Sequence, residues 1–145
     1  MIALDTNILV ALHREDSDHH RAALQAYHSQ GQHTTFAFLW PCLHEFYAIV
    51  THPRIFRKPT PPRIALAAIA SWINHPDSRI LAETHGYFDL LTRLITTGSI
   101  AGPQIHDARI AALCLHHGVR ELWTADRDFS RFPQLRTRNP LISSH

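Results

Sequence analysis

The chain has very few cysteines, almost no lysine and no long apolar run. Cys42 and Cys114 are its only cysteines and form no C-x-x-C pair, which argues against a disulfide framework and predicts two core thiols in a reducing compartment. No apolar run reaches the roughly 18 residues needed to span a bilayer, so we expect no membrane segment. The chain begins MIALDTN, with no basic leader, and we therefore expect no signal peptide and a cytoplasmic protein.

The charge is also small. The formal net charge is +2, and arginine carries almost all of the positive charge because Lys58 is the only lysine. Arginine suits bidentate phosphate contacts, but so small a charge does not by itself indicate a nucleic-acid-binding protein. The 13 histidines are scattered. His44 and Glu45 are not followed by the second histidine of an H-E-x-x-H motif, so the sequence does not favour zinc.

Short apolar segments that favour strands alternate with segments of helical periodicity along the chain. We predict strands at 2–4, 34–39, 79–81, 121–124 and 135–137, and helices that begin near residues 8, 18, 41, 60, 83 and 106. Asp18 and Thr60 are predicted helix caps. The alternation predicts one α/β domain over residues 1–145, with three α/β/α layers and a mainly parallel central sheet. Sites in such sheets form at the carboxyl ends of the strands.

The aromatic residues are interpreted mainly as core. Trp40, Trp72 and Trp123 lie within apolar patterns, and we expect them in the interior rather than as base-stacking platforms. Phe129 and Phe132 are expected to pack a short helix under the site. The helices near 64–72 and 88–95 carry more apolar residues than one inner face requires, which predicts a partner surface.

Five acidic residues fall where this fold gathers a site. They follow the first strand, open two helices or follow a later strand: Asp5, Glu45, Asp107, Asp126 and Asp128. Each acid alone could cap a helix, form a turn or face solvent. Together they would repel one another unless a cation neutralised them. Carboxylate oxygens favour Mg²⁺ or Mn²⁺, which can position a phosphodiester and activate water to attack it.

Four motifs in series give the chain a resemblance to the PIN-domain ribonucleases, above all to the VapC toxins of bacterial toxin–antitoxin pairs. They are D-T-N after the first strand, H-E-F-Y opening a helix, H-D-A-R-I-A-A, and L-W-T-A-D-R-D-F near the C-terminus. The likeness covers essentially the whole chain. It implies a PIN-like fold and a Mg²⁺- or Mn²⁺-dependent endoribonuclease. The catalytic and metal-binding acids it implies are Asp5, Glu45, Asp107 and Asp126, with Asp128 as a further metal ligand.

The resemblance also implies neighbours and partners of the site. Thr6 and Thr124 match positions where the family commonly has a hydroxyl beside the acids. The implied substrate is structured or single-stranded RNA, and the implied partners are a second copy of the chain and a VapB-type antitoxin. The antitoxin's C-terminal segment would lie over the acidic site. The loop with Arg54, Arg57 and Lys58 could contact the RNA backbone or be a solvated loop.

Several alternatives stay open. The acids could serve a DNA nuclease or a metal phosphatase, although a D-x-D pair after the first strand is absent because Thr6 and Asn7 follow Asp5. The chain could also be a non-catalytic PIN-like module that binds RNA or a partner. His44 and His106, each beside an acid, could be a general base or a helix-surface residue.

The two C-terminal acids are ranked by position. Asp126 lies on the loop that leaves the carboxyl end of the sheet, so we assign it to the metal cluster. Asp128 precedes a predicted helical turn, and we assign it a mixed role as cap of that turn and outer ligand.

Overall fold

The computed structural model describes residues 1–142. Its five strands form one parallel sheet in the order β3-β2-β1-β4-β5. The strands are β1 (Ile2–Leu4), β2 (Phe36–Leu39), β3 (Ser78–Leu81), β4 (Glu121–Trp123) and β5 (Thr137–Arg138). The helices are α1 (Thr6–His13), α2 (His20–Ser29), α3 (Trp40–Val50), α4 (Pro62–Ile73), α5 (Tyr87–Gly98) and α6 (Ile105–His116), with short 3₁₀ helices η1 (Gly102–Gln104) and η2 (Arg127–Arg131).

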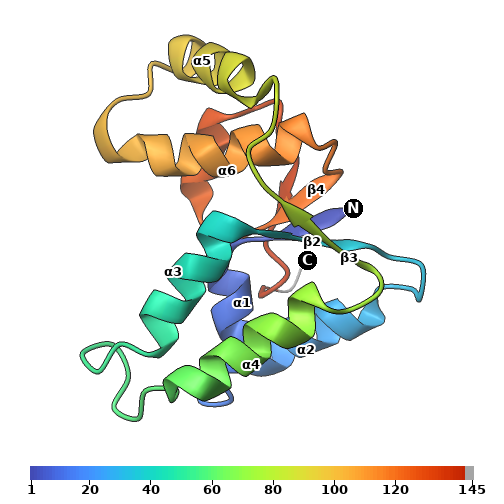
Figure 1. The fold of residues 1–145 in the computed structure, drawn as a ribbon, viewed down its shortest axis with the longest axis vertical. Coiled ribbons are helices and arrows are strands. Elements are labelled where there is room, and N and C mark those ends of the chain that lie inside the picture. Colours follow the sequence, from blue (N-terminus) through green and yellow to red (C-terminus); the bar gives the residue numbers. More distant parts are fainter. Residues whose placement is uncertain (143–145) are drawn as a thin grey trace.

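The helices cover both faces of this sheet. Figure 1 shows α5 and α6 on one side of the sheet and α1 to α4 on the other. The three-layer α/β/α fold with a parallel sheet is therefore confirmed. The chain alternates strands with helices because a parallel connection must cross over the sheet before the next strand can pair.

The central strands bring the candidate site residues to one edge of the sheet. Every residue of β1, β2 and β4 is buried, as expected for parallel strands covered on both faces. The register pairs Leu4 with Trp123, and the backbone N–H of Asp5 donates to the Trp123 carbonyl at 3.0 Å. Asp5, Trp40 and Thr124 therefore all leave the sheet at its carboxyl edge, where ligand sites of this fold class form.

Two predicted helix caps are wrong. The N-cap position of α2 is His19, not Asp18, and no side chain caps the helix there. Thr60 does not cap α4, because its hydroxyl contacts His13 at 3.1 Å and accepts a hydrogen bond from Arg14 at 3.2 Å. Both corrections arise from turns and long-range contacts that helical periodicity does not encode.

The helix predicted from residue 83 begins later, at Tyr87. Gly86 precedes it with a left-handed φ of 91°, a conformation that interrupts any helix starting upstream. The segment before Gly86 is also fixed from α6, because His117 Nε2 contacts the carbonyl oxygen of Ala82 at 2.8 Å. Packing against α6 thus determines where α5 starts.

The three tryptophans occupy different environments. Trp123 is fully buried, and Trp72 is half-buried against other aromatic rings. Trp40, by contrast, is 37% exposed, so its assignment to the core is wrong. The prediction for the residues under the site is confirmed, because Phe129 and Phe132 are buried and belong to or adjoin η2.

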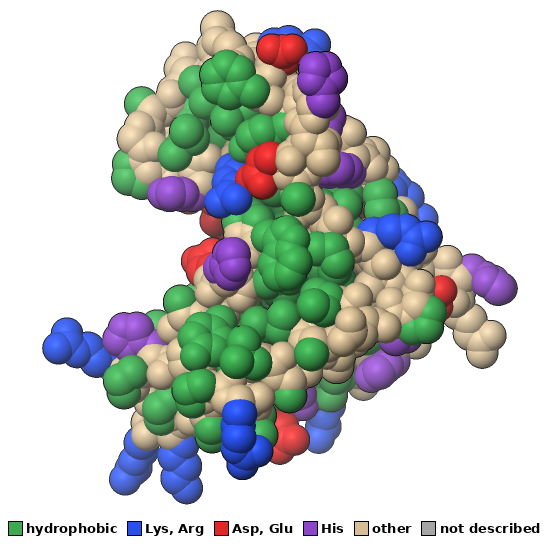
Figure 2. Space-filling model, viewed as in Figure 1, with side chains coloured by type: hydrophobic (Ala, Val, Ile, Leu, Met, Phe, Trp, Pro, Cys, Tyr) green, Lys and Arg blue, Asp and Glu red, His purple; other side chains and the backbone are tan. Residues whose placement is uncertain are grey.

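The outer helices keep large apolar side chains at the surface. Leu66 of α4 is 56% exposed and Phe88 of α5 is 73% exposed. Ile64 of α4 is also exposed, whereas the neighbouring Ala65 is buried. Figure 2 shows hydrophobic side chains gathered over α4 and α5. Across residues 1–142, no helix is both long enough and apolar enough to cross a membrane.

Candidate metal centre

Three carboxylates converge at the carboxyl edge of the sheet. Asp107 lies in the first turn of α6, Asp126 immediately precedes η2, and Asp128 lies within η2. One oxygen from each lies within 4.8 Å of the others. Asp107 and Asp126 are half-buried and Asp128 is exposed. We call these three residues the three-acid cluster, which brings together α6 and η2, the elements before and after β4.

Asp5 is buried beside this cluster in a network of hydrogen bonds. Its Oδ1 accepts from the backbone N–H of Thr6 at 2.8 Å, which makes Asp5 the N-cap of α1. Its Oδ2 accepts from the Thr124 hydroxyl at 2.7 Å and from Asn7 Nδ2 at 3.1 Å. The Thr124 oxygen in turn accepts the backbone N–H of Asp126 at 3.0 Å. Thr124 therefore links Asp5 to the three-acid cluster.

Glu45 joins the site from the opposite side. It lies in the second turn of α3, and its Oε2 accepts a hydrogen bond from the Thr6 hydroxyl at 3.0 Å. Thr6 is the first residue of α1, so the contact depends on the packing of α1 against α3. Hydrogen bonds through Thr6 and Thr124 thus link Glu45, Asp5 and Asp126, and Asp107 and Asp128 lie close to Asp126 in the three-acid cluster. We call the five acids together the acidic site.

The protonation of Asp5 responds to opposing influences. Burial is the largest and raises the pKa of Asp5 above its ordinary value. The hydrogen bonds from Thr124 and Thr6 lower that pKa, while the negative charges of Glu45 and Asp126 raise it. Burial and the neighbouring negative charges favour the protonated form of Asp5. The hydroxyl and amide donors oppose them and stabilise the carboxylate form.

The charge of Asp107 is disfavoured first by its burial and then by its acidic neighbours. Burial raises the pKa of Asp107, and the charges of Asp126, Asp5 and Asp128 raise it further. Arg131 opposes them and lowers the pKa. The electrostatic field at Asp107 is therefore dominated by like charge, the situation that a bound cation relieves.

The two cysteines are buried thiols. Cys42 Sγ lies 3.7 Å from Asp5 Oδ1, in position to donate a weak hydrogen bond. Burial and the charge of Asp5 hold the pKa of Cys42 well above its ordinary value. Burial also raises the pKa of Cys114 to about 12. Both thiols stay protonated at neutral pH, which confirms the prediction of core cysteines and gives neither the reactivity of a thiolate.

Two structural roles in the site were missed or misassigned from the sequence. Asn7 bridges the two loops of the site, because its Nδ2 donates to Asp5 and its Oδ1 accepts the backbone N–H of Ala125 at 3.0 Å. Its only signal was its place as the third residue of D-T-N. The cap of η2 is made by Asp126, whose Oδ1 accepts the backbone N–H of Asp128 at 2.8 Å, so the cap assigned to Asp128 is wrong.

The basic residues considered for RNA contact lie away from the acids in the loop between α3 and α4. Arg54, Arg57 and Lys58 are all exposed there. Among residues 1–142, no hydrogen bond or ion pair joins their side chains to the acidic site. They form a separate basic surface.

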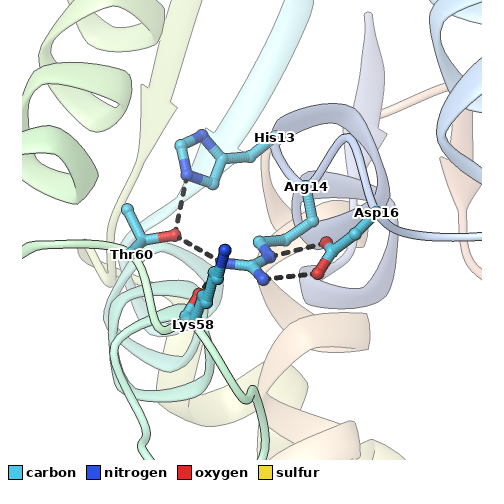
Figure 3. Close-up of polar contacts among 5 residues, drawn as sticks. All are labelled: His13, Arg14, Asp16, Lys58 and Thr60. Carbon is cyan, nitrogen blue, oxygen red and sulfur yellow. Dashed lines mark hydrogen bonds and ion pairs between the residues drawn. The ribbon is translucent and has the colours of Figure 1, made fainter.

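Arg14, at the end of α1, anchors this loop (Figure 3). Its Nη1 donates to the Lys58 carbonyl at 2.8 Å and to the Thr60 hydroxyl at 3.2 Å. Its Nε and Nη2 donate to the two oxygens of Asp16 at 2.9 and 2.6 Å. The guanidinium carbon also lies 4.0 Å from the centre of the Phe56 ring. Arg14 is itself buried and donates four hydrogen bonds, two of which hold the loop in place.

The donor chemistry of the acidic site fits a hard divalent cation. The converging side chains of the three-acid cluster offer only carboxylate oxygens. Mg²⁺ and Mn²⁺ prefer oxygen ligands, whereas zinc usually takes histidine or cysteine. Asp107, Asp126 and Asp128 could therefore hold such an ion, with Asp5 beside them.

The chain matches a known family model, and it is similar to known proteins in sequence and in fold. The family model described as the PIN domain matches residues 2–135. The chain is 30% identical to Ribonuclease VapC48 of Mycobacterium tuberculosis over 137 residues, which cover 94% of each chain. It is similar in fold to the crystal structure of VapC20 of M. tuberculosis, described as a sarcin–ricin loop cleaving toxin. That match has a TM-score of 0.68 and 18% identity, and it covers 90% of this chain and 93% of the other. A toxin–antitoxin complex from Klebsiella pneumoniae matches with a TM-score of 0.61 and 21% identity, over 97% of this chain and 98% of its own.

Proposed function

Since this chain belongs to the PIN-domain family, with VapC ribonucleases among its relatives, we propose that it is a metal-dependent endoribonuclease acting as the toxin of a toxin–antitoxin pair. The observation that carries the proposal is the convergence of Asp107, Asp126 and Asp128 within 4.8 Å, with Asp5 hydrogen-bonded into the same site. We assign Asp5, Glu45, Asp107 and Asp126 as the catalytic and metal-binding acids, and Asp128 as a further metal ligand. The substrate would be RNA, cleaved in the cytoplasm.

The acids and threonines of the site have different proposed roles. Asp107, Asp126 and Asp128 would hold Mg²⁺ or Mn²⁺, and the bound ion would supply charge neutralisation and a more acidic water for attack on phosphorus. Thr124 holds the Asp5 carboxylate in place and stabilises its charge through the 2.7 Å hydrogen bond. Thr6, the first residue of α1, holds the Glu45 carboxylate of α3 in the same way through a 3.0 Å hydrogen bond. These bonds orient the acids before RNA arrives, which limits the reorganisation that the reaction requires.

The decisive experiment measures cleavage of RNA with Mg²⁺ and with excess EDTA. We expect endonucleolytic products in Mg²⁺, recovery in Mn²⁺, and none in EDTA. Cleavage that persists unchanged in EDTA would contradict the metal mechanism. Binding of RNA without cleavage under every metal condition would support the alternative of a non-catalytic PIN-like module. Cleavage of DNA in preference to RNA would indicate the DNA nuclease instead.

A second experiment tests the link to toxicity. Expression of the chain alone is expected to arrest growth, and Asp5→Asn is expected to relieve the arrest by removing a charged site residue of nearly the same shape. The exposed acid Asp18 offers a matched control, because Asp18→Asn removes the same charge far from the acidic site and should stay toxic. Growth arrest by a folded Asp5→Asn protein equal to that of the wild type would mean that the nuclease is not the cause.

The exposed apolar side chains of α4 and α5 support the proposed partners. Leu66 and Phe88 are large, exposed and apolar, and such surfaces commonly mark protein interfaces. We propose that they contribute to a homodimer and to the surface that a VapB-type antitoxin covers. Light scattering with and without a co-expressed antitoxin tests this, and a strict monomer at high concentration in both samples would contradict it.

A further inference from the structure

An exposed pair of aromatic rings lies beside the acidic site. Trp40 is the first residue of α3, and His44 follows one helical turn later on the same face. Their ring centres are 6.0 Å apart and their planes differ by 28°, so the two rings are stacked. We propose that Trp40 and His44 form a stacking platform for one unpaired RNA base next to the bond that is cut. The inference rests on the proposed ribonuclease function and deepens it.

The exposure of Trp40 distinguishes it from the other tryptophans. Trp123 is fully buried, and Trp72 packs against the rings of Phe38 and Phe46. Trp40 is 37% exposed, and the ring it contacts, His44, is itself exposed. Trp40 is therefore the only exposed one of the three tryptophans, and part of its aromatic surface is open to a ligand.

The platform is rigidly connected to the acids. Glu45 follows His44 directly, and its carboxylate is fixed by the Thr6 hydroxyl at 3.0 Å. Trp40 and Glu45 are five residues apart on one helix, about 7.5 Å along its axis and about 140° around it, with His44 between them in angle. Figure 2 shows acidic and histidine side chains side by side where the surface is hollowed between the half with α5 and α6 and the half with α3 and α4.

The chemistry of the platform favours a nucleobase over an apolar protein segment. His44 stacks on Trp40 and Glu45 follows His44 in the chain, whereas the large exposed apolar residues of α4 and α5 belong to other helices. Proteins that act on unpaired RNA commonly stack bases on exposed aromatic rings. Every base has a π-face, so such a platform positions a nucleotide with little regard to its sequence. Stacking there would hold the neighbouring phosphate over the acidic site.

The test is a binding cycle in EDTA, where no metal-dependent cleavage occurs. The probes are short single-stranded poly-adenylate RNA and the same sugar–phosphate chain without any bases, which no shift of register can compensate. Wild-type protein should bind the intact RNA about tenfold more tightly than the abasic chain. Trp40→Ala should remove that difference, and Trp40→Phe should keep most of it. Phe88→Ala, which deletes an exposed aromatic ring on α5, should keep all of it.

Further readouts separate the outcomes. Intact RNA should quench the tryptophan fluorescence of the wild type more strongly than that of Trp40→Phe. This comparison is useful because the phenylalanine substitution keeps an aromatic ring and disturbs the fold little. His44→Ala should weaken the preference for intact RNA in part. A base preference that survives in folded Trp40→Ala, or a wild type that binds intact and abasic RNA equally, would overturn the inference. So would a Trp40→Ala protein that loses only its dimer. The proposed nuclease activity is tested by a different measurement, RNA cleavage in Mg²⁺ compared with EDTA. The binding ratios therefore do not decide whether the protein is a nuclease.

Discussion

Replacing Asp107 by asparagine removes one of three mutually repelling charges and should stabilise the metal-free protein. Two unit charges 4.8 Å apart, the span of the three-acid cluster, repel by about 1 kcal/mol in bulk water and about 3.5 kcal/mol at an effective dielectric constant of 20. Asp128 is exposed and Arg131 partly compensates Asp107, so the lower part of that range applies. We expect Asp107→Asn to gain about 1–2 kcal/mol, or about 3–8 °C in Tm for a domain of this size.

The gain should depend on pH. An acid whose pKa is raised on folding holds its proton more tightly in the folded state, so the folded state loses stability as pH rises through that pKa. The pKa of Asp107 is raised, mainly by burial and by the charge of Asp126. The advantage of Asp107→Asn should therefore be largest at neutral pH and should vanish as pH falls toward 3.8, the ordinary pKa of an aspartate.

The assay compares thermal unfolding of both proteins by circular dichroism in low salt with EDTA. His13 also affects the pH dependence, because burial lowers its pKa and the folded state then loses stability as pH falls below 6.5. That loss is common to both proteins, so the difference between them isolates Asp107. Asp18→Asn is the matched control and should change stability by less than about 0.5 kcal/mol.

In Mg²⁺ the wild type should become more stable than Asp107→Asn, the reverse of the order expected in EDTA. Mg²⁺ stabilises the wild type more the more tightly it binds, and Asp107→Asn should gain much less because one carboxylate ligand of the ion is missing. Two results would refute this reasoning: an Asp107→Asn protein that is no more stable than wild type in EDTA at neutral pH, or one that Mg²⁺ stabilises as much as the wild type.

Three other substitutions test the roles assigned to single residues. Asp126→Asn should lower single-turnover cleavage at matched Mg²⁺ by roughly tenfold or more, whereas Asp128→Asn should fold normally and keep partial activity; the reverse order would exchange their roles. Thr124→Val removes the hydroxyl that lowers the pKa of Asp5, and it should weaken Mg²⁺ binding, measured by calorimetry, by roughly tenfold; unchanged binding would make Thr124 dispensable. Arg14→Gln should cost about 2 kcal/mol in denaturant unfolding and expose the basic loop to trypsin, since a buried, hydrogen-bonded cation is lost; an equally protected loop would contradict its anchoring role.

Several features of the site could be predicted from local sequence. Asp5 and Asp126 each follow a short apolar strand, and all-parallel pairing takes such residues to the same edge of a sheet. Because acids gathered at that edge repel one another, the sequence alone predicted a divalent cation there. The strand and sheet predictions were confirmed because strands are indicated by short-range patterns and their parallel pairing by the helices between them, whereas the bound cation stays a prediction.

Only the tertiary structure decided how the acids are linked and which aromatic rings reach solvent. Glu45 joins the acidic site through Thr6 because α1 packs against α3, a contact between residues 39 positions apart. Asn7 holds two loops together across an even longer separation, and nothing in D-T-N distinguishes that role from a turn. Trp40 sits in an apolar stretch that predicts burial, yet the helix it begins places its ring partly in solvent. Hydrophobic pattern specifies that a residue suits an interior, whereas its exposure depends on which neighbouring element covers it, and that is fixed only when the whole chain is packed.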